Sequence, residues 1–176
     1  MQNDEQLMLD FQMGSSKAFE ELFIRYRQRI YAFFRRRLNH ASRAEELAQE
    51  TFVIIIRDAV RYEARAKFRT YVFGIALKQL WSERRKASRD ARLTAEPFEK
   101  STGSDPADAL WVRDALSRIE EDHREVLMLR EYEDLSYDDI AEVLSIPVNT
   151  VRSRLFRARS ELRSLLSQDA ARKVSQ

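Results

Sequence analysis

SYDDIAEVLSIPVNTVRSRLFRAR, residues 136–159, decides the fold of the C-terminal part of the chain. Ser136 followed by Asp139 predicts a capped helix start, because the two side chains can each accept a backbone N–H. Ser145 and Ile146 form the expected turn, and Pro147 suits the first position of the next helix, where its missing N–H would have no partner. The apolar residues that can join the two helices are Ile140, Val143, Leu144, Val151 and Leu155. The stretch therefore predicts a helix-turn-helix.

The second helix of this stretch, expected over residues 148–166, is rich in arginine on one side. Val151 and Leu155 are four residues apart and face inward, which leaves the polar side chains outside. Arginine can pair with guanine in bidentate fashion, asparagine with adenine, and serine or threonine with bases or phosphates. The side chains expected to bind DNA are Asn149, Thr150, Arg152, Ser153, Arg154, Arg157 and Arg159. The alternative is a solvated charged face, although such a face normally mixes both signs, and here only Glu161 is acidic nearby.

The whole chain of 176 residues is expected to be all-α. It contains three glycines and three prolines, and its apolar residues recur at spacings of three and four. An amphipathic helix is expected from about residue 19 to 38, followed by a helix over 43–60 that Ser42 and Glu45 would cap, and by a helix over 67–87. These three helices can share one core rich in aromatic residues.

A second group of helices is expected after a linker. Residues 88–107 lack apolar periodicity and contain Pro97, Gly103 and Pro106, which predicts a flexible segment. Helical spacing returns from Leu110 to about Tyr132 and leads into the helix-turn-helix. We therefore expect two small helical domains, 1–87 and 108–176, joined by a flexible linker over 88–107.

Composition excludes several classes of function. The chain has no cysteine, so disulfides, thiolate metal sites and cysteine nucleophiles are absent, and a reducing cytoplasm is the expected location. Its two histidines, His40 and His123, are not at a spacing that ligates a metal, and no glycine-rich phosphate loop occurs. No apolar run approaches the ~18 residues of a membrane span. We expect no catalytic residue, no metal, no cofactor and no membrane insertion, and so a protein that is not an enzyme.

Charge is distributed unevenly, although the formal net charge is only +2. Basic residues crowd 57–86 and 152–163, whereas acidic residues gather at 45–50 and 120–139. The helix over 67–87 mixes aromatic and basic side chains, a combination that suits single-stranded nucleic acid, because bases stack on rings while cations follow phosphates. The side chains expected to make these contacts are Arg69, Tyr71, Lys78, Gln79, Trp81, Arg84 and Arg85. The alternative for Tyr71 is a place in the core.

Three segments carry a resemblance to a known family: residues 125–159, RAEELAQETF at 43–52 and FRTYVFGIA at 68–76. They resemble sigma factors of bacterial RNA polymerase of the extracytoplasmic-function (ECF) type, over about residues 17–166. The resemblance implies that the helix-turn-helix reads the −35 promoter element and docks on the polymerase flap, and that the 67–87 helix holds the opened −10 element. It also implies that the 43–52 segment binds the clamp helices of the largest polymerase subunit. The residues implied in this last contact are Glu45, Glu46, Leu47, Gln49, Glu50 and Phe52.

The same resemblance implies the partners of the chain: core RNA polymerase, promoter DNA and an anti-sigma factor, with a monomer as the free state. The chain departs from the family at Arg43, where aspartate is usual, and at Lys78, where asparagine is frequent. On spacing alone, the acids at 45–50 could form an ordinary helix surface stabilised by the helix dipole. Two other functions stay open here: a stand-alone helix-turn-helix regulator that dimerises through its N-terminal half, and an interaction protein whose N-terminal half binds another factor.

Overall fold

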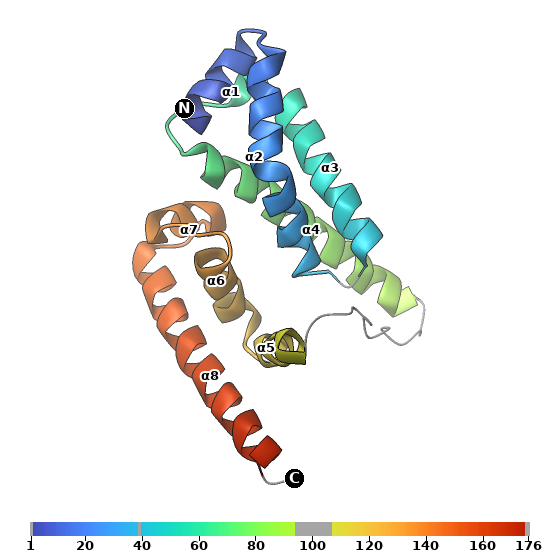
Figure 1. The fold of residues 1–176 in the computed structure, drawn as a ribbon, viewed down its shortest axis with the longest axis vertical. Helices are drawn as coiled ribbons and strands as arrows, with labels where there is room; N and C mark the ends of the chain where they lie inside the picture. Colours follow the sequence, from blue (N-terminus) through green and yellow to red (C-terminus); the bar gives the residue numbers. More distant parts are fainter. Residues whose placement is uncertain (1, 39, 94–106, 175–176) are drawn as a thin grey trace. The chain divides into compact units, whose positions relative to one another are not determined.

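The computed structural model describes residues 2–38, 40–93 and 107–174, and within these ranges the chain forms helices and no strand (Figure 1). The chain divides into two compact units, Met1–Ser101 and Thr102–Gln176. The expected all-α fold with two helical units is confirmed.

The first unit is built on three long helices, α2 (Ser16–Arg35), α3 (Ala41–Arg57) and α4 (Phe68–Leu93), each of which packs on the other two (Figure 1). Aromatic rings fill the space between them: Tyr26 lies edge-on to Phe68 with centroids 5.2 Å apart. The largest fully buried side chains of this unit are Leu7, Met8, Leu22, Ile30, Phe33, Phe34, Leu47, Ile55, Phe68, Phe73, Leu77 and Leu80. Burial of each such side chain contributes about 1.5–3 kcal/mol, so this aromatic-rich core holds the three helices together.

Two short helices complete the first unit: α1 (Asp4–Gln12) and the 3-10 turn η1 (Ala59–Arg61). The sequence analysis did not predict α1. Its Leu7 and Met8 are fully buried, and its Glu5 carboxylate accepts the backbone N–H of Phe68 at 2.8 Å. Gly14, at φ +101°, lies in the left-handed region that favours glycine, and it turns the chain from α1 into α2.

Two expected boundaries of the first unit were wrong. The α3 helix begins at Ala41, after His40, so Ser42 lies inside its first turn and does not cap it as expected. The α4 helix continues past residue 87 to Leu93, so 88–93, the first part of the expected linker, is helical. The remainder of that linker up to residue 106 lies outside the described residues.

The second unit contains α5 (Ala107–Ser117), α6 (Glu121–Glu131), α7 (Tyr137–Leu144) and α8 (Val148–Val174). The helical set expected between 110 and 132 is therefore two helices, and α8 extends beyond the expected end at 166. The α8 helix packs on α5, α6 and α7, so it is the central helix of this unit. The buried side chains of the second unit include Ile119, Val126, Leu129, Leu135, Ile140, Val151, Leu155 and Ala158.

The helix-turn-helix of the second unit forms as the sequence predicts. Ser136 Oγ accepts the backbone N–H of Asp139 at 3.1 Å, and Asp139 accepts the backbone N–H of Ser136 at 3.0 Å, which is the expected capping box. At the turn, Ser145 has φ 55° and the backbone N–H of Ile146 donates to Ala141 at 3.0 Å. A left-handed residue followed by this bond closes α7 and redirects the chain into α8.

Candidate nucleic-acid interface

One side of α8 is free of core packing and carries most of the predicted DNA-binding residues. Val151, Leu155 and Ala158 are at most 2% exposed and turn towards the other helices. On the opposite side, Asn149, Arg152, Ser153 and Arg157 are exposed, and Thr150 is partly exposed. Arg152 donates to the Asn149 amide oxygen at 3.1 Å, and the Ser153 hydroxyl donates to the carbonyl of Thr150 at 3.0 Å. The donors of this outer face are therefore arranged side by side on one rigid helix.

The two other predicted arginines of α8 are joined to α6. Arg154 pairs with Asp122 at 2.5 Å, and its side chain is only 26% exposed. Arg159 pairs with Glu131 at 2.7 Å, and that carboxylate raises the pKa of the guanidinium. The structure thus separates the outer-face arginines, Arg152 and Arg157, from arginines that hold α6 and α8 together.

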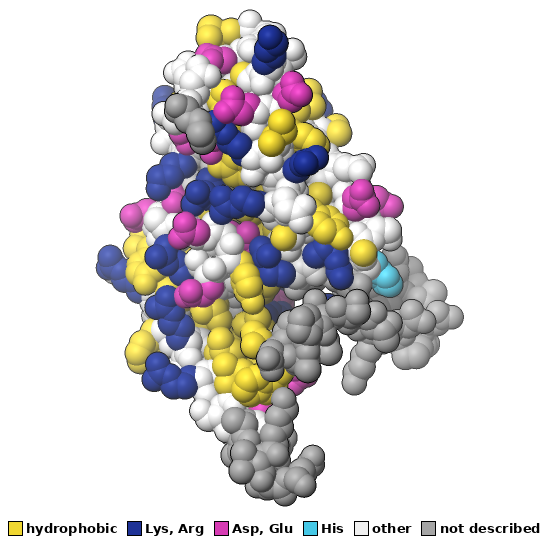
Figure 2. All heavy atoms as spheres, viewed as in Figure 1, with side chains coloured by type: hydrophobic (Ala, Val, Ile, Leu, Met, Phe, Trp, Pro, Cys, Tyr) yellow, Lys and Arg dark blue, Asp and Glu magenta, His cyan; other side chains and the backbone are white. Residues whose placement is uncertain are grey.

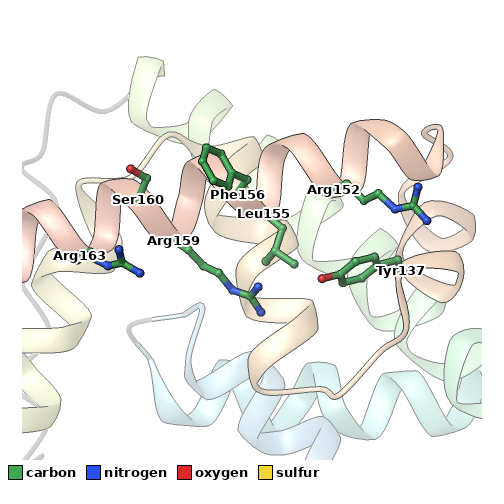
Figure 3. Close-up of a pocket in the computed structure, with 7 residues that line it drawn as sticks. All are labelled: Tyr137, Arg152, Leu155, Phe156, Arg159, Ser160 and Arg163. Carbon is green, nitrogen blue, oxygen red and sulfur yellow. The ribbon is translucent and has the colours of Figure 1, made fainter.

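Phe156 is a residue that the sequence analysis missed. Its ring is 75% exposed on the outer face of α8, between Arg152 and Arg157 in sequence. It borders a cavity of about 360 Å³ whose other lining residues are Tyr137, Arg152, Leu155, Arg159, Ser160 and Arg163. Figure 3 shows Tyr137 reaching from α7 towards Leu155, with Arg152 on one side and Arg159 on the other. Its position one residue after the inward-facing Leu155 is a signal that could have identified it.

Basic side chains recur along α8 beyond this cavity. Figure 2 shows dark blue basic side chains at the left edge of the view, where α8 runs, and the described basic side chains of this helix are all arginines. An arginine-rich stripe on a helix is the electrostatic feature expected of a surface that binds a polyanion.

A second candidate interface lies on the first unit, between α3, η1 and α4. Tyr71, Lys78 and Gln79 of α4, three of the predicted nucleic-acid contacts, line one cavity of about 410 Å³. The other lining residues are Ile54, Asp58, Arg61, Ile75 and Ser82. This cavity combines apolar walls, one aromatic ring and both signs of charge, which is a suitable lining for a flat, polar ring.

Burial and one neighbouring charge favour the neutral form of Tyr71. Burial raises the pKa of the Tyr71 phenol, and the negative charge of Asp58 raises it further. The adjacent Arg57 lowers the pKa of Asp58, so this carboxylate is ionised at neutral pH. The phenol is therefore a hydrogen-bond donor beside a fixed negative charge and the exposed cation of Lys78.

The other residues predicted for this interface do not line the cavity. Arg69 interacts with the hydroxyl of Tyr26, which also donates to Asp4 at 2.5 Å. Trp81 and Arg84 are partly buried and Arg85 is exposed. The structure therefore brings together three of the seven predicted side chains and distributes the other four around α4.

The acidic stretch of α3 presents a polar face. Glu45, Glu46, Gln49 and Glu50 are exposed, as a docking surface requires. Leu47 and Phe52, predicted in the same set, are 2% and 5% exposed and belong to the core. The Phe52 ring lies 4.8 Å from that of Phe23, centroid to centroid. Two apolar residues that the analysis did not include, Val53 and Ile56, are 61% and 49% exposed on the following turns of α3.

Arg43 is the centre of an ion-pair network on this face. Its guanidinium makes two hydrogen bonds of 2.8 Å to the carboxylate of Glu83 on α4, a bidentate pair that joins the two helices. It also pairs with Glu46 at 2.7 Å and with Glu50 at 3.2 Å. The hydrogen bonds from Arg43 lower the pKa of Glu83. Sequence analysis could not find this network, because Arg43 and Glu83 are forty residues apart.

The acidic and histidine side chains of the described residues do not gather into a metal site. In the part of the chain that the structure describes, no group of three or more histidine, cysteine, aspartate or glutamate side chains could hold a metal ion. His123 instead lies 2.9 Å from Glu161 and links α6 to α8. None of the helices in the described ranges is both long enough and apolar enough to cross a membrane.

These features define a class of protein. One unit is a helix-turn-helix with an exposed face of hydrogen-bond donors and cations, and the other is a helical unit with an acidic face and a cavity lined by aromatic and basic side chains. Such a chain is a DNA-binding transcription factor with a second interaction unit.

Comparison with known proteins makes the identification specific. Residues 22–90 match the family described as Sigma-70 region 2, and residues 109–162 match Sigma-70, region 4. The chain is 33% identical to the RNA polymerase sigma-H factor of Pseudomonas aeruginosa, with 92% of each chain covered. It is 31% identical to the ECF RNA polymerase sigma-E factor of Haemophilus influenzae, with 89% of this chain and 91% of that one covered.

A solved structure agrees with these matches. The sigma factor RpoE, in complex with the anti-sigma factor NepR from Bartonella quintana, superposes with a TM-score of 0.78 and 26% identity, over 86% of this chain and 98% of that chain. The chain belongs to the RNA polymerase sigma factors of the ECF type, which direct promoter-specific initiation of transcription. The alternative of a stand-alone regulator is not favoured, because the N-terminal unit is a sigma region 2.

Proposed function

We propose that the chain binds core RNA polymerase through the acidic face of α3 and reads two promoter elements, −35 with α8 and the opened −10 element with the cavity beside α4. The observation that carries the proposal is that one chain exposes a donor-rich helix-turn-helix face and, on its other unit, a separate acidic face. We assign region 2 to the first domain, now extended to Leu93, and region 4 to the domain that begins near Ala107.

The −35 assignment is supported by the outer face of α8. Arg152 and Asn149 are bonded to each other and exposed, so both can meet base edges in a major groove. Arg157 is exposed one turn later, where the helix would approach the phosphate backbone. The exposed ring of Phe156 fits apolar contact with a thymine methyl group.

The −10 assignment is supported by the cavity beside α4. An unstacked base can enter a cavity lined by Tyr71, Ile54 and Ile75, while Lys78 and Arg61 are available for phosphates. Because Tyr71 is a neutral donor and Asp58 an acceptor, the cavity can bond to both donor and acceptor groups of a base edge. This part does no chemistry on DNA, and the chain acts as an initiation factor.

The docking assignment is supported by the exposed acids Glu45, Glu46 and Glu50, followed by exposed Val53 and Ile56. A basic helix of the largest polymerase subunit could pair with the acids while its apolar residues cover the other two. Leu47 and Phe52 would support this face from the core and would not contact polymerase. We propose the polymerase flap as the partner of region 4.

The anti-sigma partner is proposed from relatives. CnrH, 25% identical with a TM-score of 0.75 over 94% of this chain and 98% of that chain, was solved in complex with the cytosolic domain of CnrY. We infer that this chain also has an anti-sigma factor, that it is monomeric when free, and that it acts in the cytoplasm, where polymerase is.

Paired variants test the proposal. In E46Q/E50Q, core polymerase affinity should fall because two docking charges are lost, whereas promoter preference in the residual holoenzyme is unchanged. In R152A/R157A, core affinity should be unchanged and footprint protection of the −35 element should be lost. The control D10N/E20Q removes two acids from α1 and α2 and should match wild type. Equal core affinity in E46Q/E50Q and wild type would show that α3 is not the docking surface.

A further inference from the structure

We propose that Arg43 determines how strongly this sigma factor docks on polymerase, because its guanidinium competes within the chain for the carboxylates that docking needs. The inference rests on the proposed role of the acidic face of α3. In this proposal Arg43 sets the affinity of the polymerase contact, and Glu83 positions Arg43.

The hydrogen bonds of Arg43 place its positive charge among the acids of this face. Arg43 is bonded to Glu83 through two hydrogen bonds of 2.8 Å and uses its remaining terminal nitrogen, Nη1, for Glu46 and Glu50, at 2.7 and 3.2 Å. The guanidinium N–H groups of Arg43 that face these three carboxylates are therefore all hydrogen-bonded. The arrangement places a cation inside the face that should attract a basic partner.

The carboxylates that Arg43 contacts differ in burial. The side chains of Arg43 and Glu83 are 29% and 22% exposed, whereas those of Glu46 and Glu50 are 59% and 52% exposed. Partly buried bidentate pairs are stronger than exposed single ones. Arg43 thus stays attached to Glu83, while Glu46 and Glu50 can exchange Arg43 for a cation of the partner.

Glu50 is held from a second side by Gln79. With its amide in the orientation that satisfies both ends, Gln79 donates to Glu50 at 3.2 Å and accepts from the backbone N–H and the hydroxyl of Thr51 at 3.2 and 2.7 Å. Two side chains from different parts of the unit thus hold this carboxylate before any partner arrives. A partner that pairs with Glu50 must first displace these hydrogen bonds, which costs free energy. The bond to Arg43 is the charged one of the two.

The decisive experiment measures affinity of the full-length chain for core polymerase as a function of salt. The double variant R43Q/E83Q removes one cation and one anion, so its net charge equals that of wild type, and its two amides can bond to each other across the α3/α4 contact. Because Glu46 and Glu50 are released, we expect binding about three- to tenfold tighter than wild type at low salt, with a steeper loss of affinity as salt rises.

The single variant E83Q should act in the opposite direction. Without its anchor, Arg43 can pair fully with Glu46 and Glu50, so we expect weaker docking than wild type by roughly twofold or more. Opposite signs for E83Q and R43Q/E83Q cannot result from a common loss of stability, which thermal unfolding will measure for both. The control K17Q, at the start of α2, should bind as wild type does.

Three outcomes would overturn the inference: R43Q/E83Q binding no tighter than wild type, E83Q binding as tightly as R43Q/E83Q, or K17Q tightening as much as the double variant. The variant E46Q/E50Q separates this failure from failure of the proposed function. If E46Q/E50Q weakens docking and R43Q/E83Q leaves it unchanged, only the role of Arg43 is wrong. If E46Q/E50Q has no effect, the docking surface itself is wrong.

Discussion

The two arginines Arg152 and Arg154, two positions apart on α8, should differ sharply when each is replaced by alanine. Arg152 lies on the exposed outer face and is bonded to Asn149, whereas the guanidinium of Arg154 is turned to Asp122 of α6. Arg152→Ala removes a donor fork that can bond to a guanine, and it leaves Asn149 without its partner. Arg154→Ala removes an ion pair that ties α8 to α6.

The expected magnitudes follow from these positions. Loss of a bidentate base contact costs about 1–3 kcal/mol, or roughly 5- to 150-fold in −35 affinity. Arg154→Ala should cost about 0.2–1 kcal/mol of folding stability, because Asp122 is 57% exposed and such pairs are weak. Its effect on promoter affinity should be small.

Holoenzyme binding to a promoter series with every single substitution in the −35 element distinguishes the two. Arg152→Ala should lose discrimination at one base pair, and Arg154→Ala should keep the wild-type pattern. A uniform loss in Arg152→Ala at all sequences, with a salt slope reduced by about one, would assign Arg152 to a phosphate. If Arg154→Ala alone relaxed base preference, the division of α8 into an outer face and an α6-facing edge would be refuted.

Three further predictions concern folding. Ser136→Ala removes the capping box of α7 and should lower the free energy of unfolding by about 1 kcal/mol, measured by urea denaturation. Phe33→Ala, at a fully buried position of the first unit, should cost about 3–5 kcal/mol and lower the melting temperature of that unit, and an unchanged melt would contradict the packing described. The folded pKa of Glu83 is below its ordinary value of 4.5, so its pair with Arg43 stabilises the fold above that pH, and this stability is lost as pH falls through the folded pKa. Arg43→Gln should therefore reduce the difference in urea stability between neutral pH and about pH 3, and an unchanged difference would show that the pair does not contribute.

The helix-turn-helix could be predicted from sequence because its signals are local. Ser136, Asp139, Val151 and Leu155 lie within one short stretch. Ser136 and Asp139 have the spacing of a capping box, and Val151 and Leu155 have the spacing of the buried side of a helix. The turn at Ser145 follows from the same pattern. The outer face of α8 was then predictable as the remainder of the helix.

Features that depend on distant residues could not be predicted. The spacing of residues 43–52 did not show that Leu47 and Phe52 are core residues, because an apolar residue beside acids can face either way until its packing partners are known. The α1 helix was missed because its stability comes from contacts with residues far along the chain, such as the bond between Glu5 and Phe68. The ion pair of Arg43 and Glu83 could not be predicted for the same reason, because its two residues are far apart in the sequence.

As a member of the sigma factors, this chain gives core RNA polymerase its promoter specificity. Run-off transcription from a genomic promoter library, with core polymerase from the same organism in the presence and absence of the chain, tests it most directly. We expect that adding the chain produces transcripts from a restricted set of promoters that share two separated elements. If no transcripts appear while the purified chain, without polymerase, binds specific duplex sites as a symmetric dimer, the claim is contradicted.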